Sequence, residues 1–506
     1  MDVFGELLEN KEVLMFKRSN GILLHISSLP GEYGIGDFGK EAYNFVDFLE
    51  RSGVNYWQIL PLGITGYGDS PYQSFSAFAG NPYFIDLDEL LQEGFLTEEE
   101  VGGENLNKNP EKVDYLHLYE GKLALLRKAY ERGKEPLKSA LEEYYQENFS
   151  WLQEFALYMA IKKAHGEKSW LEWDKEYRNW RSREVRTFVA SHQEEIFFWI
   201  FTQYYFDRHW HRLKTYANDK GIEIIGDLPI YVSEDSADVW KNPELFRLDE
   251  NLKPITVAGC PPDAFSSTGQ LWGNPIYDWE RMKDIGYQWW IKRIAHSFKL
   301  YDVLRIDHFR GFEAYWEVPY GEDTATFGEW TKGPGIELFE AIKEELGDLR
   351  IIAEDLGYLT PEVEELIRDS GYPGMKVLQF AFDPREESDY LPHNYNKNSV
   401  VYTGTHDNHT VRGWTENIPG EELDFAKKYL KLDEVEGCPW GMIRGAWSSV
   451  SNIAVAPMQD FLELGDEARM NIPSTLGDNW DWRMEKHQLI EDLARRIDDL
   501  NKTYGR

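Results

Sequence analysis

Eight short apolar runs, separated by segments with helical patterns, constrain the fold of this chain more than any other feature. Each run is apolar throughout instead of alternating with polar residues, which is typical of strands buried on both faces of a parallel sheet. Eight such strands alternating with helices predict an α/β fold, the (β/α)8 TIM barrel. The strands are expected at residues 22–26, 55–60, 222–226, 302–306, 351–353, 376–380, 399–402 and 453–456, with helices at 38–51, 334–346 and 361–370 among those between them.

Two stretches between strands are too long for a single crossover and predict insertions. The first, after strand 2, has apolar residues at helical spacing and is expected to be mostly helical. Its Trp170, Trp173 and Trp180 either contact a ligand or pack in the helical core. The expected division is 1–87 for barrel strands 1 and 2, 88–215 for the helical subdomain, 216–232 for strand 3, 233–280 for a loop-rich insertion over the barrel mouth, and 281–506 for strands 4 to 8.

Composition disfavours several classes of partner. The chain carries 54 basic and 89 acidic residues, a net charge of −35, which argues against binding to nucleic acid or anionic membranes. The same charge either disfavours phosphorylated substrates or serves only solubility. Two cysteines, Cys260 and Cys438, fit a reducing compartment. Since no secretory segment and no apolar stretch of membrane-spanning length is visible, we expect a cytoplasmic protein.

Acidic residues stand at or just past the ends of four predicted strands: Asp227, Asp307, Glu354 and Asp407. In a TIM barrel the carboxyl ends of the strands form one face, where functional residues gather. Arg305 lies two residues before Asp307 and therefore faces the same side of its strand. A neighbouring guanidinium stabilises the ionised form of a carboxyl group. The pair is either part of a site or an ordinary ion pair.

The spacing of these acids suits the cleavage of glycosidic bonds. Retaining cleavage uses an ionised nucleophile and a protonated acid about 5–5.5 Å apart. Strands 4 and 5 are neighbours in a barrel, so Asp307 and Glu354 are expected at about that separation. Asp355 follows Glu354, and a like charge nearby raises a carboxyl pKa. Asp407 is expected to accept hydrogen bonds from sugar hydroxyls, with His406 as a donor beside it.

Two other patterns point to different chemistry. Gly34, Gly36 and Gly39 match the dinucleotide-binding pattern G-x-G-x-x-G, but seven residues separate them from the predicted strand, whereas the fingerprint requires them at its end. An ordinary loop is the favoured interpretation. His406 and His409 are spaced like a metal pair, but no further ligands accompany them. We therefore predict no metal site.

Five ordered motifs then resemble a known family: SPYQSFSAFAGNP at 70–82, GDLPIYV at 226–232, RIDHFRGF at 305–312, AEDLG at 353–357 and THDN at 405–408. The chain resembles the amylomaltases, the 4-alpha-glucanotransferases (disproportionating enzymes) of the alpha-amylase clan of retaining glycoside hydrolases. The similarity extends from about residue 18 to about residue 484, nearly the whole chain.

The resemblance implies roles for individual residues. Asp307 is expected as nucleophile, Glu354 as general acid/base and Asp407 as transition-state stabiliser, with Arg305 and His406 in support. It implies an acceptor-site loop at 261–274, a second glucan contact at Tyr67, and no metal or organic cofactor. The substrate-binding residues that it implies are Tyr72, Asp227, Phe265, Gln270, Trp272, Asn274, His308 and Asn471.

Three departures from the family pattern affect acceptor preference and product size. Ala264 stands where a tyrosine is common, Ser474 where a glycine is usual, and His409 where an acid is frequent. None of them coincides with the residues expected to carry the chemistry.

The expected function is transfer of a segment of an α-1,4-glucan to the 4-hydroxyl of an acceptor glucose or glucan, with maltooligosaccharides as substrates. Three alternatives stay open from the sequence: an α-1,4-glucan hydrolase of the α-amylase type, a catalytically silent carbohydrate-binding protein, and a nucleotide-dependent oxidoreductase. The oligomeric state is expected to be a monomer or a homodimer.

Overall fold

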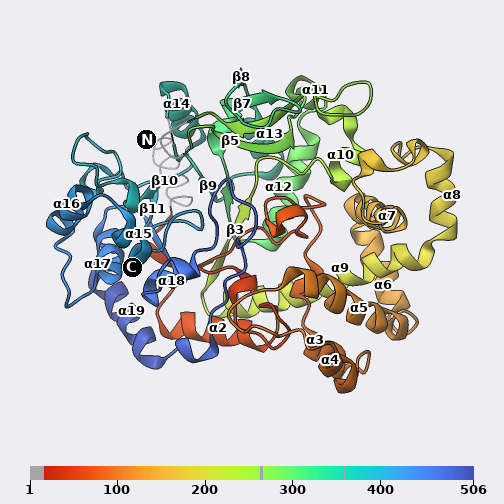
Figure 1. Ribbon diagram of the computed structural model, residues 1–506, viewed down its shortest axis with the longest axis horizontal. Helices are drawn as coiled ribbons and strands as arrows, with labels where there is room; N and C mark the ends of the chain where they lie inside the picture. Colours follow the sequence, from red (N-terminus) through yellow and green to blue (C-terminus); the bar gives the residue numbers. More distant parts are fainter. Residues whose placement is uncertain (1–15, 263–265, 358) are drawn as a thin grey trace, which may run out of the picture.

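A computed structural model describes residues 16–262, 266–357 and 359–506, and within these ranges eight parallel strands close into a barrel (Figure 1). Around the barrel the strands follow the order β1-β12-β11-β10-β9-β6-β3-β2. The predicted (β/α)8 fold is therefore confirmed. The barrel strands are β1 Ser19–Leu23, β2 Tyr56–Gln58, β3 Glu223–Leu228, β6 Val303–Ile306, β9 Ile351–Ala353, β10 Gly374–Val377, β11 Ser399–Tyr402 and β12 Ile453–Pro457.

β9 and β11 have the predicted bounds, the other barrel strands differ from the prediction by one to three residues, and the largest shifts are in β1 and β10. β1 begins at polar Ser19 and ends at Leu23, because Ser19 and Asn20 pair with β12 and the Asn20 side chain is buried, donating to the Gly53 carbonyl at 3.1 Å. β10 ends at Val377, and the apolar residues that follow turn into a 3-10 helix, Leu378–Phe380. Apolar character alone does not separate a buried turn from a buried strand.

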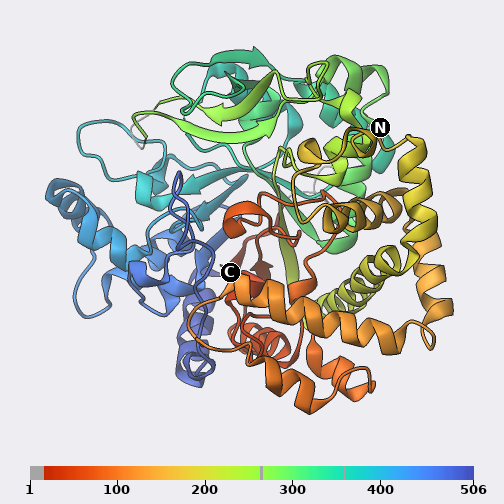
Figure 2. The ribbon, with the colours of Figure 1, turned by 45° about the vertical axis from the view of Figure 1, so that its right-hand side comes forward.

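Helices surround the barrel (Figures 1 and 2). α2 buries Ala42, Phe45 and Leu49 on one face, as the helical spacing of these residues requires. α12 packs against α9 and α13, α13 against α14, and α19 against α2 and α17. The helices outside the first insertion are α2 Lys40–Arg51, α10 Ala237–Lys241, α11 Trp279–Asp284, α12 Gln288–Leu300, α13 Ile336–Leu346, α14 Pro361–Ser370, α15 Val411–Asn417, α16 Gly420–Leu430, α17 Cys438–Ser448, α18 Met458–Phe461 and α19 Glu491–Tyr504.

The segment between β2 and β3 is helical (Figure 1). Its last helix, α9, packs against α2 and β3 of the barrel and also against α5, α6 and α7. Trp170 and Trp173 are 0% and 1% exposed, so they pack in the core instead of facing a ligand. The helices are α3 Leu87–Gln92, α4 Glu98–Glu104, α5 Tyr115–Gly133, α6 Lys138–Glu147, α7 Phe149–Ala164, α8 Arg183–Ser191 and α9 Gln193–Asp219.

A small antiparallel sheet lies outside the barrel, at the top of Figure 2, and sequence analysis did not predict it. Its order is β5-β4-β7-β8, with β4 Thr256–Cys260 and β5 Gln270–Pro275 from the segment after β3, and β7 Ala314–Pro319 and β8 Glu329–Lys332 from the segment after β6. These strands are short and partly polar, and their pairing joins two distant segments. A pattern read along the chain does not detect such pairing.

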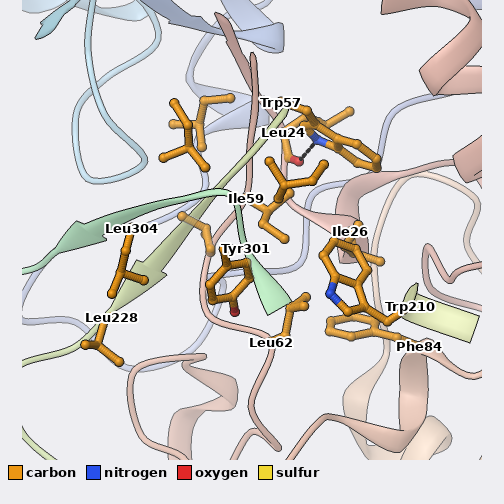
Figure 3. Packing of buried hydrophobic residues seen from close by; sticks show 14 of the residues in the cluster. Leu24, Ile26, Trp57, Ile59, Leu62, Phe84, Trp210, Leu228, Tyr301 and Leu304 are labelled. Carbon is orange, nitrogen blue, oxygen red and sulfur yellow. Dashed lines mark hydrogen bonds between the residues drawn. The ribbon is translucent and has the colours of Figure 1, made fainter. Parts of the chain in front are cut away.

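One apolar cluster fills the space between strands and helices (Figure 3). Trp57 is buried within it and satisfies its indole N–H by donating to the Leu24 carbonyl at 2.8 Å. The ring of Tyr301 lies 2.1 Å from the position that a Cβ on Gly226 would take, so only glycine fits before Asp227. Among the described residues, no helix is long and apolar enough to cross a membrane.

Candidate active site

The carboxyl ends of neighbouring strands bring the predicted acids together. β3 pairs with β6 so that Asp227 lies opposite Arg305, and β6 pairs with β9 up to Ile306 and Ala353. Asp307 and Glu354 follow these last two residues directly, and the Glu354 N–H donates to the Ile306 carbonyl at 3.0 Å. The two acids therefore lie side by side at adjacent strand ends, as the sequence predicts.

Arg305 links two of the acids. Its Nη1 lies 2.7 Å from each carboxylate oxygen of Asp227 and 3.1 Å from Oδ1 of Asp307. Burial opposes the charge on Arg305, but the two carboxylates raise its pKa well above the ordinary value. Tyr72 donates to Oδ2 of Asp227 at 2.7 Å. Asp227 is thus fully engaged, whereas the Asp307 side chain remains 30% exposed and open to a ligand.

The neighbouring carboxyl groups of Asp307 and Glu354 both have raised pKa values. For Asp307, burial raises the pKa, Arg305 opposes it, and Asp227 and Glu354 raise it further. For Glu354, burial again raises the pKa, opposed by Arg305 and by two backbone N–H donors, Leu356 at 2.8 Å and His308 at 2.6 Å. Two such groups side by side retain a shared proton more readily than isolated acids do. Direct contact with Arg305 favours Asp307 as the ionised member.

Asp355 was expected to raise the pKa of Glu354, but its side chain lies elsewhere. Asp355 is buried and points toward β10, where its Oδ1 accepts a hydrogen bond from the Met375 N–H at 2.6 Å. Burial raises the pKa of Asp355 itself to about 6. The raised pKa of Glu354 is due first to its own burial, and among nearby acids to Asp227. The alternation that places Arg305 and Asp307 on one side also predicts opposite sides for successive residues such as Glu354 and Asp355, and it was not applied here in the sequence analysis.

Asp407 lies in the loop after β11, which β10 separates from β9 in the barrel. Its Oδ1 accepts a hydrogen bond from Asn471 Nδ2 at 2.6 Å and lies 3.4 Å from His406 Nε2. The His406 ring stacks on Tyr72 with centroids 5.3 Å apart, and burial lowers its pKa, opposed by Asp407. The Asp407 side chain is 44% exposed, so one side of the carboxylate faces outward.

β5 and the residue after Asp307 form a further part of the site. The Trp272 ring meets His308 edge to face, with centroids 4.7 Å apart, and its indole N–H donates to Gln270 at 3.3 Å. His308 adopts a left-handed backbone (φ 49°), and burial lowers its pKa to about 3. Asn274 donates to the Val232 carbonyl at 2.8 Å. His308 thus lies beside the acids, because its N–H donates to Glu354, and Trp272 packs on it, while Gln270 and Asn274 belong to the same strand as Trp272.

The other residues named from the sequence are partly outside the described residues and partly the departures from the family pattern. Phe265 and Ala264 lie outside the described residues, and so does the side chain of Tyr67, whose backbone belongs to a short 3-10 helix. Ser474 adopts φ 64°, a left-handed conformation that favours the glycine usual there. His409 Nδ1 lies 2.6 Å from Oδ2 of Asp466, so this departure has an acidic partner of its own.

Sequence analysis missed three residues of the site. Gln73 donates to the Trp272 carbonyl at 3.3 Å and to Asn274 Oδ1 at 3.2 Å, and its place inside the 70–82 motif was an available signal. Trp480 packs at 5.8 Å from both Tyr72 and His406, and Arg469 donates to the Asp407 carbonyl at 2.6 Å. No motif marked these two. Within the described ranges, no three His, Cys, Asp or Glu side chains form a group that could hold a metal ion.

Comparison with known proteins identifies close relatives. The profile of a family described as 4-alpha-glucanotransferase matches residues 24–489. A 4-alpha-glucanotransferase of Clostridium butyricum is 53% identical over 96% of this chain and 100% of the relative. One from Streptococcus pneumoniae is 54% identical over 97% of this chain and 98% of the relative.

Solved structures agree with the sequence comparison. The amylomaltase from Streptococcus agalactiae, determined in complex with acarbose, superimposes with a TM-score of 0.94 at 46% identity, covering 97% of this chain and 100% of that one. The amylomaltase from Corynebacterium glutamicum, at 19% identity and a TM-score of 0.76, shares the fold. The chain belongs to the 4-alpha-glucanotransferases, glucan-transglycosylating enzymes of the alpha-amylase clan.

Proposed function

We propose that this enzyme transfers a segment of an α-1,4-glucan to the 4-hydroxyl of an acceptor glucose or glucan by a retaining double displacement. The observation that carries the mechanism is the placement of Asp307 and Glu354 after paired residues of adjacent strands. Adjacent strands lie about 4.8 Å apart. That spacing suits the about 5–5.5 Å of retaining enzymes, whereas inverting enzymes need about 6.5–9.5 Å to admit a water molecule.

In the first step, the Asp307 carboxylate attacks the anomeric carbon and the bond from that carbon to O4 of the leaving glucan breaks. Glu354 gives its proton to this O4, and the glycosyl group stays on Asp307 as a β-linked ester. The raised pKa of Glu354 helps it to retain the proton that this step needs. Burial raises the pKa of Asp307, and Arg305, 3.1 Å away, opposes this rise and so favours the ionised nucleophile.

In the second step, Glu354 removes the proton from the 4-hydroxyl of the acceptor, whose oxygen attacks the same anomeric carbon. The ester to Asp307 breaks, and two inversions give net retention of the α configuration. We propose that Asp407, held by Asn471 and beside His406, binds hydroxyls of the distorted sugar ring in both steps. Tyr72, Trp272 and the other predicted binding residues except Asp227 would contact the glucan around this ring. Asp227 is buried and held by Arg305 and Tyr72, so it would support the site through them.

Transfer must compete with hydrolysis, because water is a far more abundant acceptor. An oriented acceptor reaches effective molarities of about 10⁵ M or more, which outweighs the about 55 M of bulk water. A covered site that holds the acceptor in line therefore favours transfer. The acarbose complex of the Streptococcus agalactiae amylomaltase supports a glucan-like ligand for this fold.

We further propose maltooligosaccharides and longer α-1,4-glucans as substrates, with no cofactor, since carboxyl groups supply both nucleophile and proton. Cytoplasmic location, based on the two cysteines, and a monomeric or homodimeric state are also proposals.

The test is the product profile from maltotriose. The purified enzyme should release glucose and build a ladder of longer dextrins while the number of reducing ends stays nearly constant. Asp307→Asn should lower this activity by about 10⁴-fold or more without unfolding the protein. A steady rise in reducing ends without longer products would instead indicate the α-amylase type of hydrolase.

A further inference from the structure

Arg469 joins the two loops that form the Asp407 side of the site. Its Nη2 donates to the Asp407 carbonyl at 2.6 Å, and its Nε donates to the Asn471 carbonyl at 2.9 Å. One planar guanidinium thus holds the loop after β11 and the segment after α18 at a fixed separation.

The same two segments are linked by the groups that orient the Asp407 carboxylate. Asn471 Nδ2 donates to Asp407 Oδ1 at 2.6 Å, and the Asn471 backbone N–H donates to the His406 carbonyl at 3.1 Å. Within its own loop, the Asp407 carboxylate has the longer contact with His406 Nε2 at 3.4 Å, and the Asp407 backbone N–H donates to Thr405 Oγ1 at 3.3 Å. The direction of the carboxylate therefore depends on where the Asn471 segment lies, and Arg469 holds that segment in place.

Arg469 is in turn held in place by His409, which contacts Asp466. Its Nη1 lies 3.3 and 3.4 Å from the two ring nitrogens of His409, and His409 Nδ1 lies 2.6 Å from Asp466 Oδ2. A ring with its proton on Nδ1 donates to Asp466 and leaves Nε2 to accept from Arg469. Asp466 is fixed in turn by the Thr410 N–H at 3.2 Å and by Asn417 at 3.3 Å.

The charges on these groups agree with this arrangement. Arg469 is half-buried, and burial lowers its pKa, opposed by Asp466 and Asp407 on either side. A cation between two acids costs less than an isolated one, so the guanidinium remains charged and its hydrogen bonds are strengthened. A lysine at this position could donate to either carbonyl, but it lacks the planar fork that spans both.

We propose that Arg469 is a positioning residue that sets the orientation of Asp407 in the transition state, with His409 and Asp466 as its brace. This rests on the role proposed for Asp407 above. Arg469 donates to backbone carbonyls and to a neighbouring ring, so it acts through the loops and not on the sugar. A small displacement of such a group can lower a rate by about 100-fold.

The first test compares Arg469→Gln and Arg469→Lys with the matched control Arg412→Lys, whose exposed side chain pairs with Glu416 in α15. With maltotriose as substrate, kcat should fall by about 10–100-fold for Arg469→Gln and by less for Arg469→Lys. KM should stay within about twofold, and the control should behave as the wild type. An unchanged kcat, or a loss confined to KM, would overturn the proposal.

The second test is a double-mutant cycle with Asp407→Asn, using α-maltosyl fluoride, because fluoride release needs little acid assistance and is detected at low rates. If Arg469 acts through Asp407, adding Arg469→Gln to Asp407→Asn should lower the rate less than twofold further. The full single-mutant loss in that background would refute the positioning role while leaving the proposed function intact. Wild-type activity of Asp407→Asn would refute the role proposed for Asp407 and, with it, the positioning role of Arg469.

Discussion

At the scale of single residues, two buried acids near the site, Asp355 and Asp460, have raised pKa values. Burial raises the pKa of Asp355 to about 6, and it does the same for Asp460. Asp460 is 1% exposed, and it joins α18 to the loop that carries Asp407 by accepting from the Val411 N–H at 2.7 Å and from the Thr403 hydroxyl at 2.6 Å. Oδ1 must accept from the Val411 N–H, but the second position can be an acceptor or a donor because the Thr403 hydroxyl can do either, so neither bond needs a charge.

Asp460→Asn should therefore stabilise the protein at neutral pH. The folded pKa of about 6 exceeds the ordinary value of 3.8, so the folded state binds more protons than the unfolded state between these values. The wild type consequently loses stability as the pH rises through this window, and the amide does not. The advantage of the variant should grow from near zero at about pH 4 to at most about 3 kcal/mol at about pH 7.

Denaturant unfolding at several pH values measures this difference. Asp492→Asn, a substitution on an 81% exposed side chain in α19, is the control and should change stability little at any pH. A constant difference between Asp460→Asn and the wild type across the range would show that Asp460 does not titrate as described.

At the scale of elements, the loop between β1 and α2 explains the glycine pattern that resembles a dinucleotide site. A Cβ on Gly36 would lie 1.9 Å from the Ile26 carbonyl oxygen, and one on Gly34, which has φ 78°, would lie 2.4 Å from the Leu106 carbonyl oxygen. These glycines allow backbones to approach each other closely. Gly36 and Gly34 are thus required by close packing of the loop, on its own backbone at Ile26 and against Leu106 of the inserted segment.

Gly36→Ala should destabilise the protein by about 3 kcal/mol or more, because the backbone at Ile26 must move to make room for the added Cβ. Gly102→Ala in α4 is the matched control, since nothing lies within 4 Å of its added Cβ. Alanine there should be neutral or stabilise by up to about 1 kcal/mol. Thermal unfolding distinguishes the two, and equal stabilities would contradict the packing described for the loop.

The success of the sequence analysis also varies by element. β9 and β11 were predicted at their observed bounds, because each is a short buried run of a parallel sheet, apolar throughout in β9 and apart from Ser399 in β11. The acids at strand ends could be predicted because a barrel brings those ends together. The small outer sheet could not be predicted, because its paired strands β4 and β7 come from separate segments of the chain. The role of Arg469 could not be predicted either, because its partners are backbone carbonyls, whose positions depend on loop conformations that no local sequence pattern encodes.

At the scale of the whole molecule, the segment after β2 contacts β5 of the outer sheet close to the site. Gln73, from the segment after β2, donates to Trp272 and Asn274 of β5, and Asn274 donates back to Gln73 Oε1 at 3.4 Å. The outer sheet that carries β5 is thereby tied to the barrel side of the site. We infer that this tie helps to keep water from the glycosyl ester.

Gln73→Ala should therefore raise the ratio of hydrolysis to transfer, by about two- to tenfold if hydrogen bonds of about 0.5–1.5 kcal/mol are lost. The ratio is measured as new reducing ends per glucose released from maltotriose. Gln92→Ala, at the exposed end of α3, should leave it unchanged. A parallel fall of both reactions at constant ratio would show that the tie supports catalysis in general and does not exclude water.

The proposed mechanism requires that Asp307 forms the bond to the sugar. Glu354→Gln with α-maltosyl fluoride tests this directly, because fluoride leaves without the acid whereas breakdown of the ester lacks its base. Mass spectrometry of the quenched protein should show the added maltosyl mass, and peptide mapping should place it on Asp307. An adduct on another carboxylate, or rapid turnover with no adduct and inverted products, would contradict the mechanism.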